Sequence, residues 1–181
     1  MDHRIVAALK QIIAAIKPIN NLALFVDSME DNEFRVILLY DPSNEKLIGG
    51  ADIEFDSAND AWVVSGIYAD KGWGPTLYLT LKAISEPHGL TASPSGDEGH
   101  TREGAVKVWQ NFYDGVGKDL VTKEKLDDDR GHDDEALTYK YHPVKKPNWQ
   151  QAMKAHDKYE SDNPDIVENL RDQATEKWQD I

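Results

Sequence analysis

Four apolar segments in quick succession constrain the fold more than any other feature of the sequence. They are LALFVD, FRVILLY, LIGGADIEF and AWVVSGIY. Each is rich in the β-branched and aromatic residues typical of strands, and the turn-forming pieces SMEDN, DPSNE and DSAND separate them. Connections this short leave no room for a crossover helix, so the segments predict an antiparallel meander.

The third and fourth segments differ in how we expect them to be buried. In the third, Ala51, Ile53 and Phe55 alternate with Asp52 and Glu54, which predicts one buried face and one wet face. The fourth segment is apolar on both faces over most of its length. We therefore expect it at the centre of the sheet.

Helical spacing of apolar residues marks most of the remaining chain. It predicts helices over residues 2–17, 75–88 and 101–115, and two more from Pro147 onward, the second starting at Asn163-Pro164. GLTAS and ALTYKYH are interpreted as short strands, so a strand–helix–strand crossover follows the meander.

Together these elements predict an α/β fold of the mixed α+β kind. Its sheet is mixed, mainly antiparallel, with about six or seven strands flanked by helices. We expect one domain over residues 1–146 and a C-terminal helical extension over residues 147–181. The extension carries an apolar stripe, which either packs on the sheet or docks onto a partner protein. The stripe consists of Ile166, Leu170, Ala174 and Trp178.

Charge and composition exclude several classes of function. The chain has 20 Lys and Arg against 33 Asp and Glu, a net charge of −13, which argues against nucleic-acid binding. The absence of cysteine excludes disulfides, thiol catalysis and cysteine-type zinc sites. We expect no signal peptide and no membrane span, hence a cytoplasmic location. His132 lies in an acidic loop that does not match the calcium-loop pattern, so we expect no metal.

The turn KGWGP, between the fourth strand and the next helix, is the strongest candidate site. Gly72 and Gly74 allow a ligand close to the backbone, and the first N–H groups of the following helix have no partner inside it. Pro75 suits the first helical turn, and Lys71 adds a positive charge. The dinucleotide fingerprint and the phosphate-loop pattern are both absent. The pattern is consistent either with a tight corner or with an anion site.

GWGPTLYLTLKAI and AVKVW, in this order after a meander, resemble the GNAT superfamily of acyl-CoA-dependent N-acyltransferases. The likeness covers about residues 20–115 and is strongest to the GNAT-like proteins of tailed phages, some of them internal virion proteins of short-tailed phages. It implies transfer of acetyl from acetyl-CoA to an amine. By this resemblance, the residues that would hold the pyrophosphate are Lys71, Gly72, Trp73, Gly74 and Thr76, and those lining the pantetheine are Ile67 and Tyr68.

The chain departs from the family pattern at two positions. Ala69 stands where the family has Arg or Gln, and Trp109 stands where it usually has a tyrosine general acid. Tyr113, one turn later, would then be the acid. Glu54 would be the general base, with Asp52 and Asp56 as alternatives.

These departures leave a second hypothesis from a different class. The chain would be a GNAT-fold protein without catalysis, packaged in a phage virion or bound to a host protein through its C-terminal helices.

Overall fold

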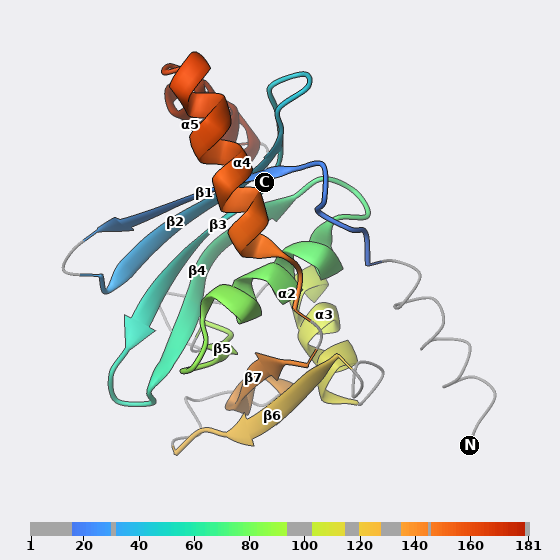
Figure 1. The fold of residues 1–181 in the computed structure, drawn as a ribbon. Helices are drawn as coiled ribbons and strands as arrows, with labels where there is room; N and C mark the ends of the chain where they lie inside the picture. The colour runs from blue at the N-terminus through green and yellow to red at the C-terminus, as the bar shows by residue number, and fades with distance from the viewer. Residues whose placement is uncertain are drawn as a thin grey trace.

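The computed structural model describes residues 16–29, 32–93, 103–114, 120–127, 135–144 and 146–179. In this part of the chain a seven-stranded sheet in the order β1-β2-β3-β4-β5-β7-β6 carries helices on both faces (Figure 1). The elements are β1 (Ala23–Met29), β2 (Phe34–Asp41), β3 (Lys46–Asp56), β4 (Ala61–Ala69), α2 (Gly74–Ile84), β5 (Leu90–Thr91), α3 (Glu103–Tyr113), β6 (Val121–Lys125), η1 (Glu135–Thr138), β7 (Tyr139–Pro143), α4 (Trp149–Asp162) and α5 (Ile166–Gln179).

The antiparallel meander is confirmed. Strands β1 to β4 pair antiparallel in sequence order, and β4 is the middle strand of the seven, as its two apolar faces predicted. The ladder between β3 and β4 shifts register after Asp52, which leaves Ser65 as an extra residue on β4. The expected α/β fold with a mixed, mainly antiparallel sheet is thus the observed one.

The crossover after the meander is also confirmed. Helix α2 follows β4 and leads to β5, which pairs parallel to β4, while β7 pairs antiparallel to β5. Helix α2 ends at Ile84 rather than at residue 88, because Pro87 disfavours a helical conformation at Glu86. Of the expected first helix only residues 16 and 17 are described, and neither is helical.

Neighbouring residues of the first strands point to opposite faces of the sheet, and both faces are covered. On one face, Ile37 and Leu39 join a core cluster with Leu77 and Leu81 of α2. On the other, a second cluster is built around α5. Its buried members are Ala23, Leu38, Tyr40, Leu47, Ile166 and Leu170. A strand that is apolar on both faces requires this double cover.

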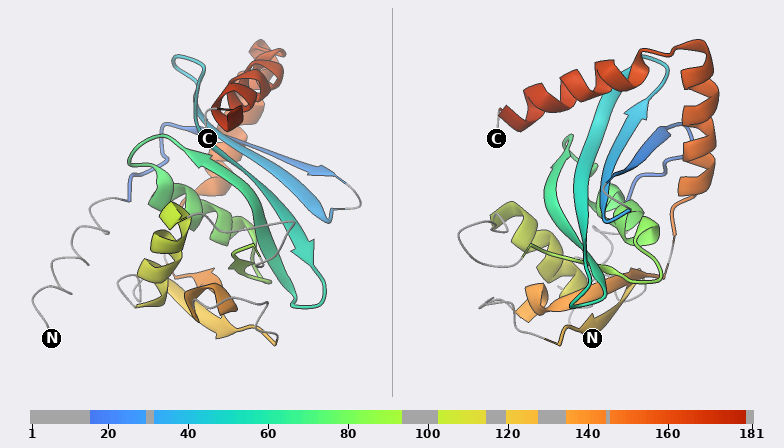
Figure 2. Two further views of the ribbon diagram at one scale, coloured as in Figure 1. Left: turned by 180° about the vertical axis from the view of Figure 1, so that it is seen from behind. Right: turned by 90° about the vertical axis from the view of Figure 1, so that its left-hand side faces the viewer.

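Helix α4 runs beside the edge strand β1, and α5 turns away from it across the sheet (Figure 2). The early residues of α4, such as Ala152, join the first cluster, whereas Tyr159 packs against the second. The C-terminal helices therefore wrap around the β1 edge from one face to the other. Since Ile166 and Leu170 are fully covered there, the apolar stripe packs on the chain's own sheet. The side chain of Trp178 lies outside the described residues.

Polar contacts also hold α4 and α5 on the sheet. The Tyr40 hydroxyl lies 2.9 Å from Nδ1 of His156, and Nε2 of His156 lies 3.0 Å from a carboxylate oxygen of Glu160. The carboxylate can only accept, so Nε2 carries a proton, and in the neutral ring Nδ1 then accepts from the tyrosine. Gln173 of α5 accepts a bond from the Leu47 N–H at 2.9 Å and donates one to the Glu45 carbonyl at 2.8 Å.

Candidate functional site: a lysine-rich glycine turn

The backbone between β4 and α2 forms a tight turn. The Trp73 N–H donates to the Asp70 carbonyl at 2.9 Å, and Gly72 has φ of +87°, which side-chain-bearing residues rarely adopt. Pro75 lies in the first turn of α2, and Trp73 caps the helix without a side-chain hydrogen bond. No described residue accepts a hydrogen bond from the N–H of Gly74, so the helix begins with an unmet donor.

The segment before β1 covers one side of the turn. The Lys17 N–H donates to the Thr76 hydroxyl at 2.8 Å, and that hydroxyl donates to the Lys17 carbonyl at 3.0 Å. Thr76 is fully buried, so its hydroxyl belongs to the fold and is not open to a ligand. The Lys17 ammonium lies 4.9 Å from the centre of the Trp73 ring, and a Cβ on Gly72 would come within 3.2 Å of it.

Two further lysines reach the turn through Asp70. Lys46 at the start of β3 lies 3.4 Å from one carboxylate oxygen of Asp70, and Lys177 near the end of α5 lies 3.9 Å from the other. The Tyr68 hydroxyl donates to the same carboxylate. Burial, and then this hydrogen bond, raise the pKa of the Tyr68 hydroxyl, so it stays protonated and remains a donor.

Two lysines thus flank the Asp70 carboxylate, Lys17 lies against Trp73 and Gly72, and the exposed Lys71 belongs to the turn itself, in a chain whose net charge is −13. We call Lys17, Lys46, Lys71 and Lys177 the turn lysines. Three of them come from segments far from the turn in sequence, which is why the sequence indicated Lys71 alone. The arrangement suits a multiply charged anion.

Among the described residues, strand β4 has a strand neighbour on its β5 side only at the end far from this turn. The parallel pairing of β4 with β5 comprises only Trp62 with Leu90 and Val63 with Thr91. From residue 64 to residue 69, β4 has no strand partner on that side among the described residues. Ile67 of this stretch packs against the core and Tyr68 points to the other face, toward Lys177. The Val64 carbonyl accepts from the Ser93 hydroxyl, and beyond it an extended ligand could follow the β4 backbone to the turn.

The predicted base candidates occupy different positions along β3. Glu54 is exposed and lies opposite Val63, in the fully paired part of β4. Asp52 lies opposite Gly66, beside the unpaired stretch, and burial raises the pKa of its carboxyl. Asp56 accepts from the Ala58 N–H at 3.0 Å and thereby holds the β3–β4 turn.

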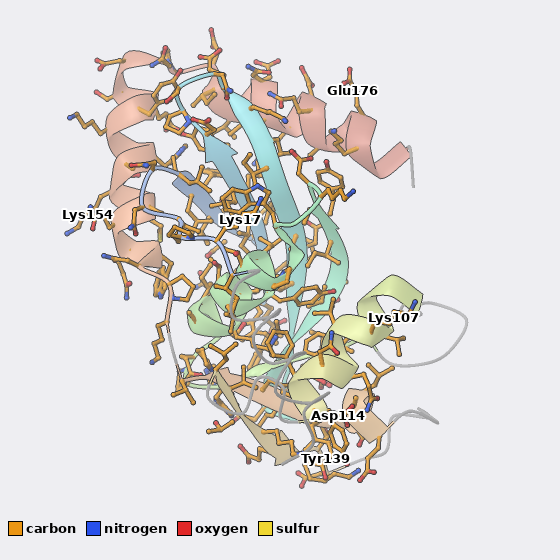
Figure 3. All side chains as sticks on the ribbon, turned by 90° about the vertical axis from the view of Figure 1, so that its right-hand side faces the viewer. Lys17, Lys107, Asp114, Tyr139, Lys154 and Glu176 are labelled. Atoms are coloured by element: carbon orange, nitrogen blue, oxygen red, sulfur yellow. The ribbon has the colours of Figure 1, made fainter. Side chains whose placement is uncertain are left out.

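Tyr113 lies away from the glycine turn. Its ring packs 5.5 Å from that of Tyr139, with the Lys123 ammonium 3.7 Å above it, and a hydrogen bond with Glu135 raises the pKa of its hydroxyl. Figure 3 shows Tyr139 at the bottom of the view and Lys17 well above it. The structure thus groups Tyr113 with β6 and β7 and does not bring it to the turn. Trp109 is a core residue.

The sequence patterns did not predict that Lys82 is buried. Lys82 of α2 is fully buried, and its side-chain nitrogen has no hydrogen-bond partner among the described residues. Four aromatic rings surround it, and burial lowers the pKa of Lys82 well below its usual value. The ring centres lie 3.6 Å (Phe112), 4.7 Å (Trp109), 5.2 Å (Tyr78) and 5.7 Å (Tyr141) from the nitrogen. Its spacing of four residues from Tyr78 was the available signal.

Metal and membrane features add nothing to the site. The described residues contain no group of three His, Cys, Asp or Glu side chains placed to hold a metal ion. His132 lies outside them. Among the helices in the described ranges, none has the length and apolarity needed to cross a membrane.

Comparisons with known proteins identify no relative: no protein-family model, no curated protein and no solved structure matches this chain.

Proposed function

We propose that the chain binds acetyl-CoA at the glycine turn and is an acyl-CoA-dependent N-acyltransferase that acetylates an amine. The observation that carries this proposal is the gathering of the turn lysines around an open glycine turn at the unpaired end of β4. The resemblance of KGWGP and its flanking elements to the GNAT superfamily suggests the ligand. The pyrophosphate would meet Lys17, Lys71 and the Gly74 N–H, and the pantetheine would follow β4 past Ile67 and Tyr68.

The chemistry requires one base near the acetyl group. An amine nitrogen attacks the thioester carbonyl, the carbon–sulfur bond breaks, the amine gives up a proton and the thiolate gains one. Asp52 suits the base better than Glu54, because it lies beside the unpaired stretch of β4 and burial raises the pKa of its carboxyl. We assign no residue as the acid that protonates the departing thiolate, since Tyr113 packs beside β6 and β7 and away from the turn.

Calorimetric titration with acetyl-CoA tests the binding half of the proposal. We expect a dissociation constant of about 1–100 µM for the unaltered protein, loss of binding in Gly74→Glu and retention in Gly74→Ala. A Cβ on Gly74 would meet nothing within 4 Å, so both variants should fold and differ only in what they place at the ligand position. The proposal fails if acetyl-CoA does not bind at millimolar concentration.

A second function, binding without catalysis, is favoured by one observation. The position of the family's acid is occupied by Trp109, which is buried in the core. A protein of this kind would bind acetyl-CoA yet release no free CoA thiol in the presence of a panel of primary amines. Thiol release that disappears in Asp52→Asn would instead establish the transferase. Docking of a phage or host protein through the C-terminal stripe is less favoured, because Ile166 and Leu170 are buried on the sheet.

A further inference from the structure

The end of helix α5 is held against the glycine turn by a mixed ionic and aromatic contact. The Lys177 ammonium lies 3.9 Å from the Asp70 carboxylate and 5.3 Å from the centre of the Tyr68 ring. Lys46 approaches the other oxygen of the same carboxylate at 3.4 Å. A helix of the C-terminal extension therefore contributes a positive charge to the candidate site.

Lys177 is carried by a well-anchored helix. Leu170 is fully buried against the sheet, and Gln173, one turn before Lys177, is bonded to both Leu47 and Glu45. A lysine on such a helix loses no additional backbone freedom when it meets an anion at the turn, because the helix is already fixed.

Asp70 and its two lysines differ in exposure. The Asp70 side chain is 18% exposed, whereas Lys46 is 58% and Lys177 41% exposed. The carboxylate is thus enclosed by its partners, while each lysine still presents much of its surface to solvent. A phosphate that arrives at the turn carries the same charge sign as Asp70 and can form charge-assisted hydrogen bonds with the lysines.

We propose that Asp70 is an internal counter-ion of the site, which holds Lys46 and Lys177 until a polyphosphate ligand at the turn competes for them. Asp70 then sets the affinity of the site, and Lys177 makes α5 a part of it. This inference rests on the proposed function for the identity of the ligand. The competition between Asp70 and the ligand for the two lysines requires only that the ligand is a polyphosphate.

Four variants, each titrated with acetyl-CoA and separately with inorganic tripolyphosphate, test the inference. Lys177→Met and Lys46→Met each remove a positive charge of the protein that would attract the ligand, and we expect each variant to bind the probes about threefold more weakly. Asp70→Asn removes the competitor and should strengthen binding by about the same factor. Lys158→Met, an exposed lysine of α4, is the matched control and should change neither affinity.

The two probes separate this inference from the proposed function. If only tripolyphosphate binds, and the affinities of the variants follow the expected order, acetyl-CoA is not the ligand but the counter-ion role of Asp70 is supported. If acetyl-CoA binds but Asp70→Asn binds no more tightly than the unaltered protein, or Lys177→Met behaves like Lys158→Met, the counter-ion role is overturned alone. Binding of neither probe overturns both. Unfolding temperatures within a few degrees of the unaltered protein would show that the variants fold.

Discussion

The Lys82 ammonium nitrogen lies 3.6 Å from the centre of the Phe112 ring, enclosed by aromatic rings of α2, α3 and β7. The rings offer attraction to a cation but no hydrogen-bond acceptor, and burial lowers the pKa of Lys82 well below its usual value, which favours the neutral amine. This contact ties the protonation state of one side chain to the packing of α3 on α2.

Replacing Lys82 by methionine should stabilise the protein and alter how its stability depends on pH. The pKa of Lys82 is lowered by folding from its usual 10.5, so between the lowered pKa and 10.5 the unfolded chain binds up to one more proton than the folded chain. The free energy of unfolding therefore rises with pH, by up to about 1.4 kcal/mol per pH unit from this group. Urea unfolding between about pH 8 and pH 10 should show this slope reduced in Lys82→Met.

Lys158→Met is the control for this experiment, because Lys158 is exposed and should leave the slope unchanged. Equal slopes for Lys82→Met and the unaltered protein would mean that the buried amine stays protonated among the rings.

Replacing Tyr40 by phenylalanine should weaken the attachment of α4. The change removes the only described partner of His156 Nδ1, and Tyr40 is fully buried, so we expect a loss of about 1–3 kcal/mol in the free energy of unfolding. Tyr159→Phe removes a hydroxyl whose partner, Glu45, can turn to water, and should cost much less. Denaturant unfolding of both variants checks the prediction, and equal losses would contradict it.

Leu170→Ala should destabilise the whole protein and not merely loosen a tail. Leu170 is fully buried between α5 and the sheet, and removal of a buried leucine side chain costs about 2–5 kcal/mol. A single unfolding transition shifted to lower urea concentration, with an unchanged slope, is the expected result. Loss of α5 helicity in a separate early transition would show instead that α5 unfolds independently.

The two glycines of the turn should respond differently to alanine. Gly72 has φ of +87° and its Cβ would approach Lys17, so Gly72→Ala should cost about 1–2 kcal/mol of stability. Gly74 has no such restriction, and Gly74→Ala should leave the unfolding temperature unchanged. Thermal unfolding of the two variants checks the prediction. A large drop in unfolding temperature for Gly74→Ala would contradict it, because neither the backbone conformation nor the space around Gly74 requires glycine.

Local patterns predicted the elements whose burial follows a simple period. The meander followed from alternating apolar residues and short turns, and α2 and α3 from apolar residues at helical spacing. Strand β6 was missed because only Val121 of its five residues is buried, so VTKEK carries no apolar alternation and forms a strand through its pairing with β7.

The candidate site was only partly predictable. The glycines and Lys71 could be recognised because they are adjacent in sequence. Lys17 and Lys177 could not, because nothing local indicates that residues 160 positions apart meet at one turn. Lys82 was missed for another reason: its residue type predicts exposure, and only its helical phase with Tyr78 indicates the core.

The wrapping of α4 and α5 around β1 has a consequence for synthesis on the ribosome. The hydrogen bond between Leu47 and Gln173 joins residues 126 positions apart, and that between Tyr40 and His156 spans 116. One face of the first three strands therefore stays exposed until α5 has emerged from the exit tunnel. During that interval the nascent meander presents an uncovered apolar surface, which makes it a substrate for chaperones that bind such surfaces and slows the final folding step.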